Sequence, residues 1–480
     1  MLLWGLAVGL LGGLLLFALT PEHWHIAVKE RSTGMRDSMI VLNQGGSLLV
    51  GRHGIGGSYY PVGIGDDEGI YVYIPALCRL FGVADPLSML RYVYVLIYGV
   101  TVAAYPMVFY RLTRSLLAGL AAPLMLLVCI LSMGFYDIYW IPAWGVLTLL
   151  PLIFLLARDW PRLGLMALAG VSLVASLLSS IRSESGLGIV IAAVVVLLLR
   201  RWRWWRALPA VALLAVIYIS IPTFVFGAIR EHRDHQINYP ALGLETTAHP
   251  LWHSIYIGLG YLPNDYGIFY KDEVAIAQVQ RQAPGTPYLS GRYASVLRKA
   301  YFNLVREHPI EVIKQYAAKA VVTVADSILY LLIALLTVPA MLLLGPECRI
   351  RRRWILLAVP VACVGFLPTM VAIPLQPYED GLYAAIGVVG ILGWCWALER
   401  IEAGAREQGG LHQALTALRG LWSDPKNRDG PLRRSARITC IALAASLVLV
   451  VGGHLIRQSA ERWQSSAPAV PAGYVRPVSP

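Results

Sequence analysis

The chain has 480 residues, of which 57% are hydrophobic and only 14% are charged, and its mean hydropathy is +0.61. Soluble domains carry about 25% charged residues, so this composition excludes a soluble globular protein and indicates a polytopic membrane protein. The formal net charge is +12, but the cations stand in short clusters between apolar segments, which is typical of cytoplasmic loops and speaks against nucleic-acid binding.

Apolar segments recur along the whole chain. A helix needs about 20 apolar residues to cross the hydrocarbon core, and by this measure we expect about eleven spans in an all-α fold. The first segment has no basic n-region and no convincing cleavage site, so we expect it to be retained as a helix. The predicted spans lie near residues 2–20, 91–110, 115–133, 138–157, 163–181, 186–199, 207–227, 326–345, 354–373, 381–398 and 437–455.

Lysine and arginine in the short connections predict the orientation. With a cytoplasmic N-terminus, every basic cluster falls on the cytoplasmic side, as the positive-inside rule requires. The clusters are Arg111 with Arg114, Arg158 with Arg162, and the stretches 200–206, 349–353 and 400–437. The outer side then receives the segments 21–90, 228–325 and 457–480.

These segments divide the chain into four parts. We expect an N-terminal transmembrane module, 1–227, whose first outer loop is 21–90. An extracytoplasmic segment, 228–325, precedes a second set of transmembrane helices, 326–456. The remaining residues, 457–480, are rich in proline, serine and alanine, and this composition predicts a disordered tail.

The first outer loop contains three consecutive carboxylates, Asp66-Asp67-Glu68. Carboxylates repel one another, so such a run is either a solvated loop or a site that holds a proton or a positive group. The next residues, Ile70–Gly82, have apolar side chains at helical spacing but are too short to span, which predicts an interfacial helix. The run Tyr301–Ala325 predicts a second interfacial helix, leading into the span near 326–345. Both helices could cradle an amphiphilic ligand or only seal helix ends.

Further polar residues fall on the same side. Arg182 stands at the outer end of a span, where an unpaired charge would be costly. It could bind a phosphate, or it could simply pair with Glu184. Tyr378 and Glu379 stand in a late outer loop, where they could line a route for a lipid or cap the next helix.

Histidines in the segment 228–325 raise the question of a metal. His232 with His235, and His249 with His253, are spaced three and four apart, which places each pair on one helix face. Such pairs with acids could bind a divalent metal, but Pro250 interrupts the second pair and no zinc-protease motif is present. The sequence therefore assigns no metal ligand and no firm cofactor, and a divalent metal stays open. Sugar hydroxyls are an alternative ligand, with Trp252 and Tyr256 as stacking surfaces.

The order of these features resembles the GT-C superfamily of polytopic glycosyltransferases, which use lipid-phosphate-linked sugars. The likeness rests on the acidic motif in the first outer loop with its interfacial helix, the Arg-x-Glu at Arg182, and the long outer segment followed by a late loop with Tyr378. It implies a membrane enzyme that moves a sugar from a polyprenyl-phosphate donor to a hydroxyl of a glycan, lipid or protein acceptor, with inversion. It also implies an extracytoplasmic active site in a cell membrane such as the bacterial inner membrane.

The resemblance also suggests roles for individual residues. The general base is expected among Asp67, Asp66 and Glu68, with Asp67 preferred and Asp66 next. The donor phosphate is expected near Arg182, Glu184, Lys314 and Lys319. The acceptor or sugar is expected near His249, Trp252, His253, Tyr256, Tyr378 and Glu379.

Two other readings compete with the enzyme. A transporter or flippase of a lipid-linked sugar should place ionisable residues at mid-bilayer, whereas here the acids gather at helix ends and loops. A scaffold whose outer segment binds a partner would leave the acidic motif without a role.

Overall fold

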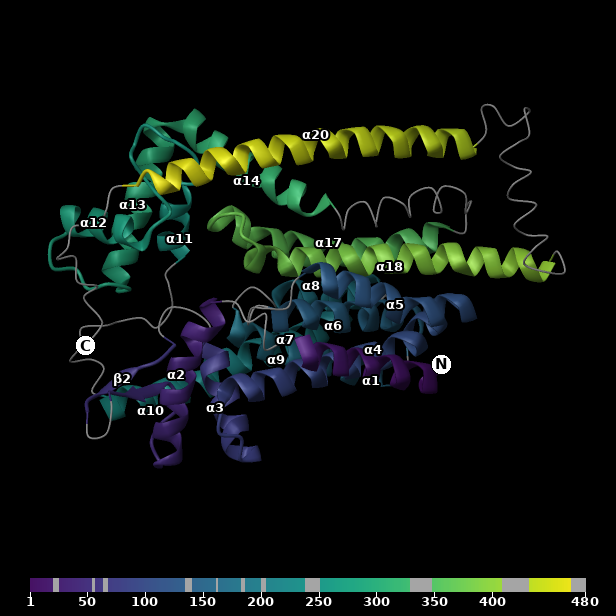
Figure 1. Ribbon diagram of the computed structural model, residues 1–480, viewed down its shortest axis with the longest axis horizontal. Helices are drawn as coiled ribbons and strands as arrows, with labels where there is room; N and C mark the ends of the chain where they lie inside the picture. The colour runs from purple at the N-terminus through teal and green to yellow at the C-terminus, as the bar shows by residue number, and fades with distance from the viewer. Residues whose placement is uncertain are drawn as a thin grey trace.

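The computed structural model describes residues 1–19, 26–53, 57–63, 68–133, 140–160, 163–182, 186–199, 204–237, 251–328, 348–407 and 431–467. Within these residues the protein is mostly helical, and its long helices run side by side along the longest axis (Figure 1). In the described part of the chain, five helices are long and apolar enough to cross a membrane: Pro86–Thr113, Trp140–Arg158, Gly164–Ile181, Ala207–Ile237 and Tyr378–Glu399. Shorter apolar helices add Leu2–Ala18, Leu116–Ile130, Leu187–Leu199 and Leu356–Val371.

Helices α1 to α9 form the N-terminal part of the bundle. Their bounds are α1 Leu2–Leu19, α2 Ile26–Asn43, α3 Glu68–Phe81, α4 Pro86–Thr113, α5 Leu116–Met133, α6 Trp140–Arg158, α7 Gly164–Ile181, α8 Leu187–Leu199 and α9 Trp204–Ser220. Helix α6 lies at the centre, where Trp140 and Trp144 are fully buried and meet Tyr94 and Tyr98 of α4 edge to face. Backbones in membranes approach through small residues, and Gly9 of α1 illustrates this, because an added Cβ would lie 2.9 Å from the Gly99 carbonyl oxygen of α4.

The segment predicted to be the first outer loop, 21–90, holds more structure than one helix. Besides α3, it contains α2 and a two-stranded antiparallel sheet, β1 Val50–Arg52 and β2 Tyr59–Pro61, in which Gly51 pairs with Tyr60. The amphipathic helix predicted at Ile70–Gly82 is confirmed as α3. The all-α expectation is therefore correct except for this short hairpin.

The remaining helices complete the molecule. A π-helical turn, Ile221–Val225, joins α9 to α10 Phe226–Ile237. The segment predicted to be extracytoplasmic contains α11 Leu251–Gly258, α12 Asp272–Gln282, α13 Gly291–Glu307 and α14 Pro309–Asp326. Three long helices follow, α17 Cys348–Val371, α18 Gln376–Glu407 and α20 Pro431–Ser465. The predicted span 326–345 falls almost entirely outside the described residues, whereas every other predicted span coincides with a described helix.

Connections between helices that were predicted to lie on the same side of the membrane do gather at the same end of the bundle. At one end Arg158 donates to the carbonyls of Arg111 and Leu112, and Glu402 accepts from Ser115 Oγ at 2.6 Å. At the other end of α18, Tyr378 lies against Arg182, and its hydroxyl is 3.5 Å from that of Tyr270, which stands between α11 and α12 in the chain. The bundle thus separates the predicted inner connections from the predicted outer ones.

Two predictions need correction. The run Tyr301–Ala325 is not one helix, because α13 ends and α14 begins at His308, whose φ of −130° leaves the helical region. Proline disfavours helical backbone at the residue before it, and here that proline is Pro309.

The second correction concerns the tail. Residues 457–465 continue α20 as helix, so the disordered tail predicted for 457–480 is wrong for this part. Tertiary contacts hold it: the ring of Trp463 stacks on Phe269 at 4.3 Å, and Gln464 donates to the Gly260 carbonyl and accepts from the Tyr270 amide. Residues 468–480 lie outside the described residues.

Candidate functional site

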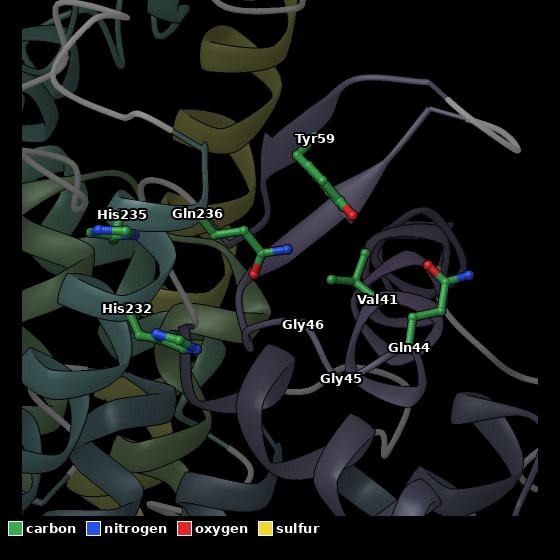
Figure 2. Close-up of a pocket in the computed structure, with 8 residues that line it drawn as sticks. All are labelled: Val41, Gln44, Gly45, Gly46, Tyr59, His232, His235 and Gln236. Carbon is green, nitrogen blue, oxygen red and sulfur yellow. The ribbon is translucent and has the colours of Figure 1, made fainter.

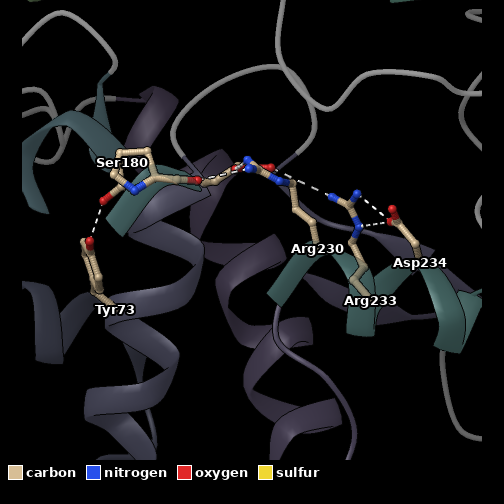
Figure 3. A network of polar contacts seen from close by, with 7 residues as sticks. Tyr73, Ser180, Arg230, Arg233 and Asp234 are labelled. Carbon is tan, nitrogen blue, oxygen red and sulfur yellow. Dashed lines mark hydrogen bonds and ion pairs between the residues drawn. The ribbon is translucent and has the colours of Figure 1, made fainter. Parts of the chain in front are cut away.

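Glu68, the last acid of the acidic motif, is the first residue of α3 and meets two arginines of α10. Its carboxylate lies 2.8 Å from Arg230 Nη1 and 3.9 Å from Arg233 Nη1. Arg233 is fully buried and also pairs with Asp234 at 2.6 Å, as Figure 3 shows. Asp66 and Asp67, which precede Glu68 in the sequence, lie outside the described residues.

The arginines are positioned by the local geometry of α10. Arg230 and Arg233 are three residues apart, so they project from the same helix face. The π-helical turn before α10 contains Pro222, whose carbonyl accepts from Arg230 Nη2 at 3.1 Å. Proline cannot donate to the helical ladder, and π-helical turns often occur at functional sites.

The start of α3 rests on the end of α7. A Cβ added to Gly69 would lie 2.7 Å from the backbone carbon and oxygen of Ser180, so only glycine fits here without a shift of the backbone. One turn later, the Tyr73 hydroxyl forms a hydrogen bond with Ser180 Oγ (Figure 3), and burial raises the pKa of Tyr73. This packing brings Glu68 next to the chain segment that ends in Arg182.

Arg182 follows α7 and meets Tyr378 in the first turn of α18. Its guanidinium carbon lies 4.5 Å above the centre of the Tyr378 ring, a cation–π arrangement. The Tyr378 hydroxyl is 3.5 Å from that of Tyr270, whose pKa is raised well above its usual value by burial. Glu184 lies outside the described residues.

The acids after Tyr378 point inward. Glu379 and Asp380 are buried, with 1% and 3% exposure, and Tyr383 donates to Glu379 Oε2 at 2.5 Å. Asp326 at the end of α14 pairs with Arg457 of α20. Ionisable side chains are thus present inside the junction of α14, α18 and α20, which the sequence did not indicate.

The two candidate lysines occupy different surroundings. Lys314 is exposed and pairs with Glu311 at 2.5 Å. Lys319 is fully buried, donates to the Met370 carbonyl of α17 at 3.0 Å and lies 5.1 Å from the centre of the Tyr316 ring. Burial lowers the pKa of Lys319 to about 7. The structure therefore places Lys319 in the protein interior.

The candidates on α11 lie mainly in the interior of the unit that α11, α12 and α13 form. His253 is buried between the Tyr293 hydroxyl, 2.7 Å from Nδ1, and Asp272 Oδ1, 3.1 Å from Nε2. Trp252 packs against Phe302 of α13 at 5.5 Å, and burial raises the pKa of Tyr256 to about 12. His249 lies outside the described residues. The partners of His253 and Trp252 come from α12 and α13.

Metal binding finds little geometric support where the chain is described. Among those residues, no three His, Cys, Asp or Glu side chains come together as a metal site. The pair His232 and His235 stands on α10 beside glutamines and glycines of a cavity.

The site contains residues that sequence reasoning did not select. Arg230, Arg233 and Ser180 contact Glu68 or the start of α3, and Tyr270 contacts Tyr378. The two arginines could have been selected from the sequence, because they lie three residues apart and so share a helix face. This segment was considered only for its histidines. Comparisons with family models, curated proteins and solved structures find no match to this chain.

Proposed function

We propose that this protein is an integral-membrane glycosyltransferase that transfers a sugar from a polyprenyl-phosphate donor to an acceptor hydroxyl on the extracytoplasmic side. One observation carries the proposal. Glu68 of the acidic motif meets Arg230 and Arg233, and the packing of Gly69 on Ser180 brings Glu68 beside the segment that ends in Arg182. A site with a base for the acceptor hydroxyl and cations for the departing phosphate is what this reaction requires.

The contacts divide the roles within the motif. Glu68 is committed to the two arginines, so it serves to fix the motif on α10. The base is then one of its neighbours, with Asp67 preferred and Asp66 next. Adjacent carboxylates raise one another's pKa, which suits a base that works near neutral pH.

Arg182 is the proposed ligand of the donor phosphate. Its guanidinium is planar and can bind a phosphate through two parallel hydrogen bonds, while the Tyr378 ring below it restricts its orientation. The sugar develops positive charge as the phosphate leaves, and the nearby carboxylates tolerate it. Attack by the acceptor from the opposite face gives inversion.

The test uses purified full-length protein in lipid nanodiscs with a polyprenyl-phosphate hexose or pentose, and measures release of polyprenyl phosphate on addition of acceptor. Loss of a general base lowers the rate about 10²–10⁴-fold, so Asp67→Asn is expected to fall by this amount. Asp66→Asn is measured separately, and Arg36→Met, which removes an exposed arginine paired with Asp85, is the control. Full turnover in both folded Asn variants would contradict the assignment of the base.

A second candidate function has one specific observation in its favour. Glu379 and Asp380 are buried at the start of the apolar helix Tyr378–Glu399, and buried ionisable residues in such helices mark transport pathways. A flippase of a lipid-linked sugar would move the donor across vesicle membranes without forming a glycosidic bond. Measuring donor movement in the same preparation separates the two functions.

A further inference from the structure

A cavity of about 390 Å³ lies beside the candidate site, between the first outer loop and α10. Figure 2 shows its walls: the end of α2 and the turn after it, strand β2, and the last turns of α10. Small-molecule sites in proteins occupy about 300–1,000 Å³. The cavity is thus large enough for one or two sugar rings.

The lining is polar and contains no acidic or strongly basic side chain. It consists of two amides, two imidazoles, one phenol, one valine and two glycines: Gln44, Gln236, His232, His235, Tyr59, Val41, Gly45 and Gly46. None of these eight residues carries a carboxylate, an ammonium or a guanidinium group. Such a surface favours a ligand that is neutral and rich in hydroxyl groups.

Protein contacts fix the direction of both amides. The backbone amide of Ser47 donates to Gln236 Oε1 at 2.7 Å, and Arg52 donates to Gln44 Oε1 at 3.4 Å. A backbone N–H can only donate, so the Gln236 atom that it meets must be the oxygen. Each glutamine therefore keeps its NH₂ group to donate to a ligand.

The imidazoles remain available as well. Within the described part of the chain, His232 and His235 are exposed and form no hydrogen bond or ion pair. A neutral imidazole carries one donor and one acceptor, which matches a hydroxyl group that both donates and accepts. The Tyr59 ring and Val41 add apolar surface for the C–H face of a sugar ring.

Glycines shape the floor of the cavity. Gly45 has a φ of +81°, which favours glycine, and no atom lies within 4 Å of an added Cβ. At Gly46 an added Cβ would lie 2.9 Å from Gln236 Nε2, so a side chain there would displace this donor.

The cavity and the charged cluster share one helix. Arg230 and Arg233 face Glu68 from α10, whereas His232, His235 and Gln236 occupy the neighbouring face at spacings of three and four. On this helix Arg230 pairs with Glu68 and Arg233 with Asp234, and Glu231 is exposed; none of these charged residues lines the cavity. The remaining nearby cation, Arg52, is engaged by Gln44 and the Gly57 carbonyl.

From these observations we propose that the cavity binds an uncharged saccharide. The nature of the ligand follows from the lining, whereas its identity as the acceptor rests on the proposed function. A saccharide held against His232 and Gln236 lies one face of α10 away from the arginines that hold Glu68, the described residue of the acidic motif. The acceptor is then a glycan or a glycosylated molecule whose neutral end occupies this cavity.

Binding is tested on the full chain in nanodiscs, without donor, by saturation-transfer NMR. The probes are methyl α-mannopyranoside, methyl β-galactopyranoside, methyl α-arabinofuranoside and maltose, with glucuronate and inorganic phosphate as anionic competitors. We expect saturable transfer to at least one neutral probe and no competition by the anions. Losing two hydrogen bonds in the double variant Gln44→Leu with His235→Ala should weaken binding about tenfold.

Two further variants complete the design. Gln44→Trp places a large side chain in the cavity and should abolish binding, whereas the double variant His454→Ala with Gln458→Leu removes an exposed histidine–glutamine pair on α20 and should leave it unchanged. No saturable signal from any neutral probe, displacement by phosphate or glucuronate, or equal binding by the Gln44→Trp variant would each overturn the proposal.

The outcomes also separate this inference from the function on which its acceptor role depends. Saccharide binding that persists in Asp67→Asn, with no transferase activity in the wild type, would keep the binding site and refute the enzyme. Transferase activity that is unaffected by Gln44→Trp would keep the enzyme and refute the cavity as its acceptor site.

Discussion

Replacement of Lys319 by methionine should change how the stability of this protein depends on pH. Lys319 is fully buried, and burial lowers its pKa from 10.5 to about 7. At 1.36 kcal/mol for each pH unit, this interval corresponds to about 5 kcal/mol. The Met370 carbonyl at the end of α17 favours the ammonium, so we expect an observable change of about 3–5 kcal/mol.

The sign follows from the protons bound in each state. Below pH 7 the lysine is charged in both states, and the folded protein bears the full cost of burying the ammonium. Between pH 7 and about 10.5 the unfolded chain keeps the proton that the folded protein has lost, so the free energy of unfolding rises with pH. Lys319→Met has no such group, and it should therefore be more stable than the wild type at pH 6.5 and lose that advantage by pH 10.

Unfolding in mixed micelles, followed by tryptophan fluorescence between pH 6.5 and 10, measures this difference. Methionine has a side chain of similar length, so the packing changes little. The lost hydrogen bond to the Met370 carbonyl lowers the unfolding free energy of Lys319→Met by about 1 kcal/mol at every pH. Lys314→Met is the matched control, because Lys314 is exposed on the same helix and paired with Glu311. A difference between wild type and Lys319→Met that is the same at pH 6.5 and pH 10 would refute the reasoning.

Three further substitutions probe the packing around the site. Gly69→Ala places a Cβ 2.7 Å from the Ser180 backbone and should cost about 1–3 kcal/mol in unfolding free energy; unchanged stability would show that α3 does not rest on α7 in this way. Arg233→Met leaves Glu68 and Asp234 without their buried cation and should cost about 3 kcal/mol in the same assay. Adding Glu68→Gln to this variant should partly recover the lost stability; if it recovers nothing, Glu68 and Arg233 are not energetically coupled. Trp463→Ala removes the stacking on Phe269 and should cost about 2 kcal/mol and expose the end of α20 to protease, whereas unchanged protease resistance would indicate that other contacts hold this end.

The helical character of the protein could be predicted from the sequence because it depends on local composition. A lipid environment offers no partner to backbone polar groups, so each long apolar segment must satisfy its own hydrogen bonds as a helix. The amphipathic spacing in Ile70–Gly82 likewise predicted α3. The bundle of long apolar helices and the grouping of their connections at two ends followed from these features.

Where the sequence failed, a distant contact overrode the local pattern. The tail after His454 has a composition typical of disorder, but Trp463 and Gln464 reach residues of the outer segment 195 and 204 positions earlier and keep the chain helical. Lys319 was expected near a donor phosphate, yet the packing of α14 against α17 buries it.

The acidic motif, Arg182 and Tyr378 were selected from the sequence because charged and aromatic residues at helix ends stand out against apolar spans. Their neighbours were not predictable. Arg230 meets Glu68 across 162 positions, and this contact depends on how α3, α7 and α10 pack together. Periodicity specifies which face of a helix is polar but not which other helix that face will meet, so the tertiary structure alone decided the charge pairs and the cavity beside them.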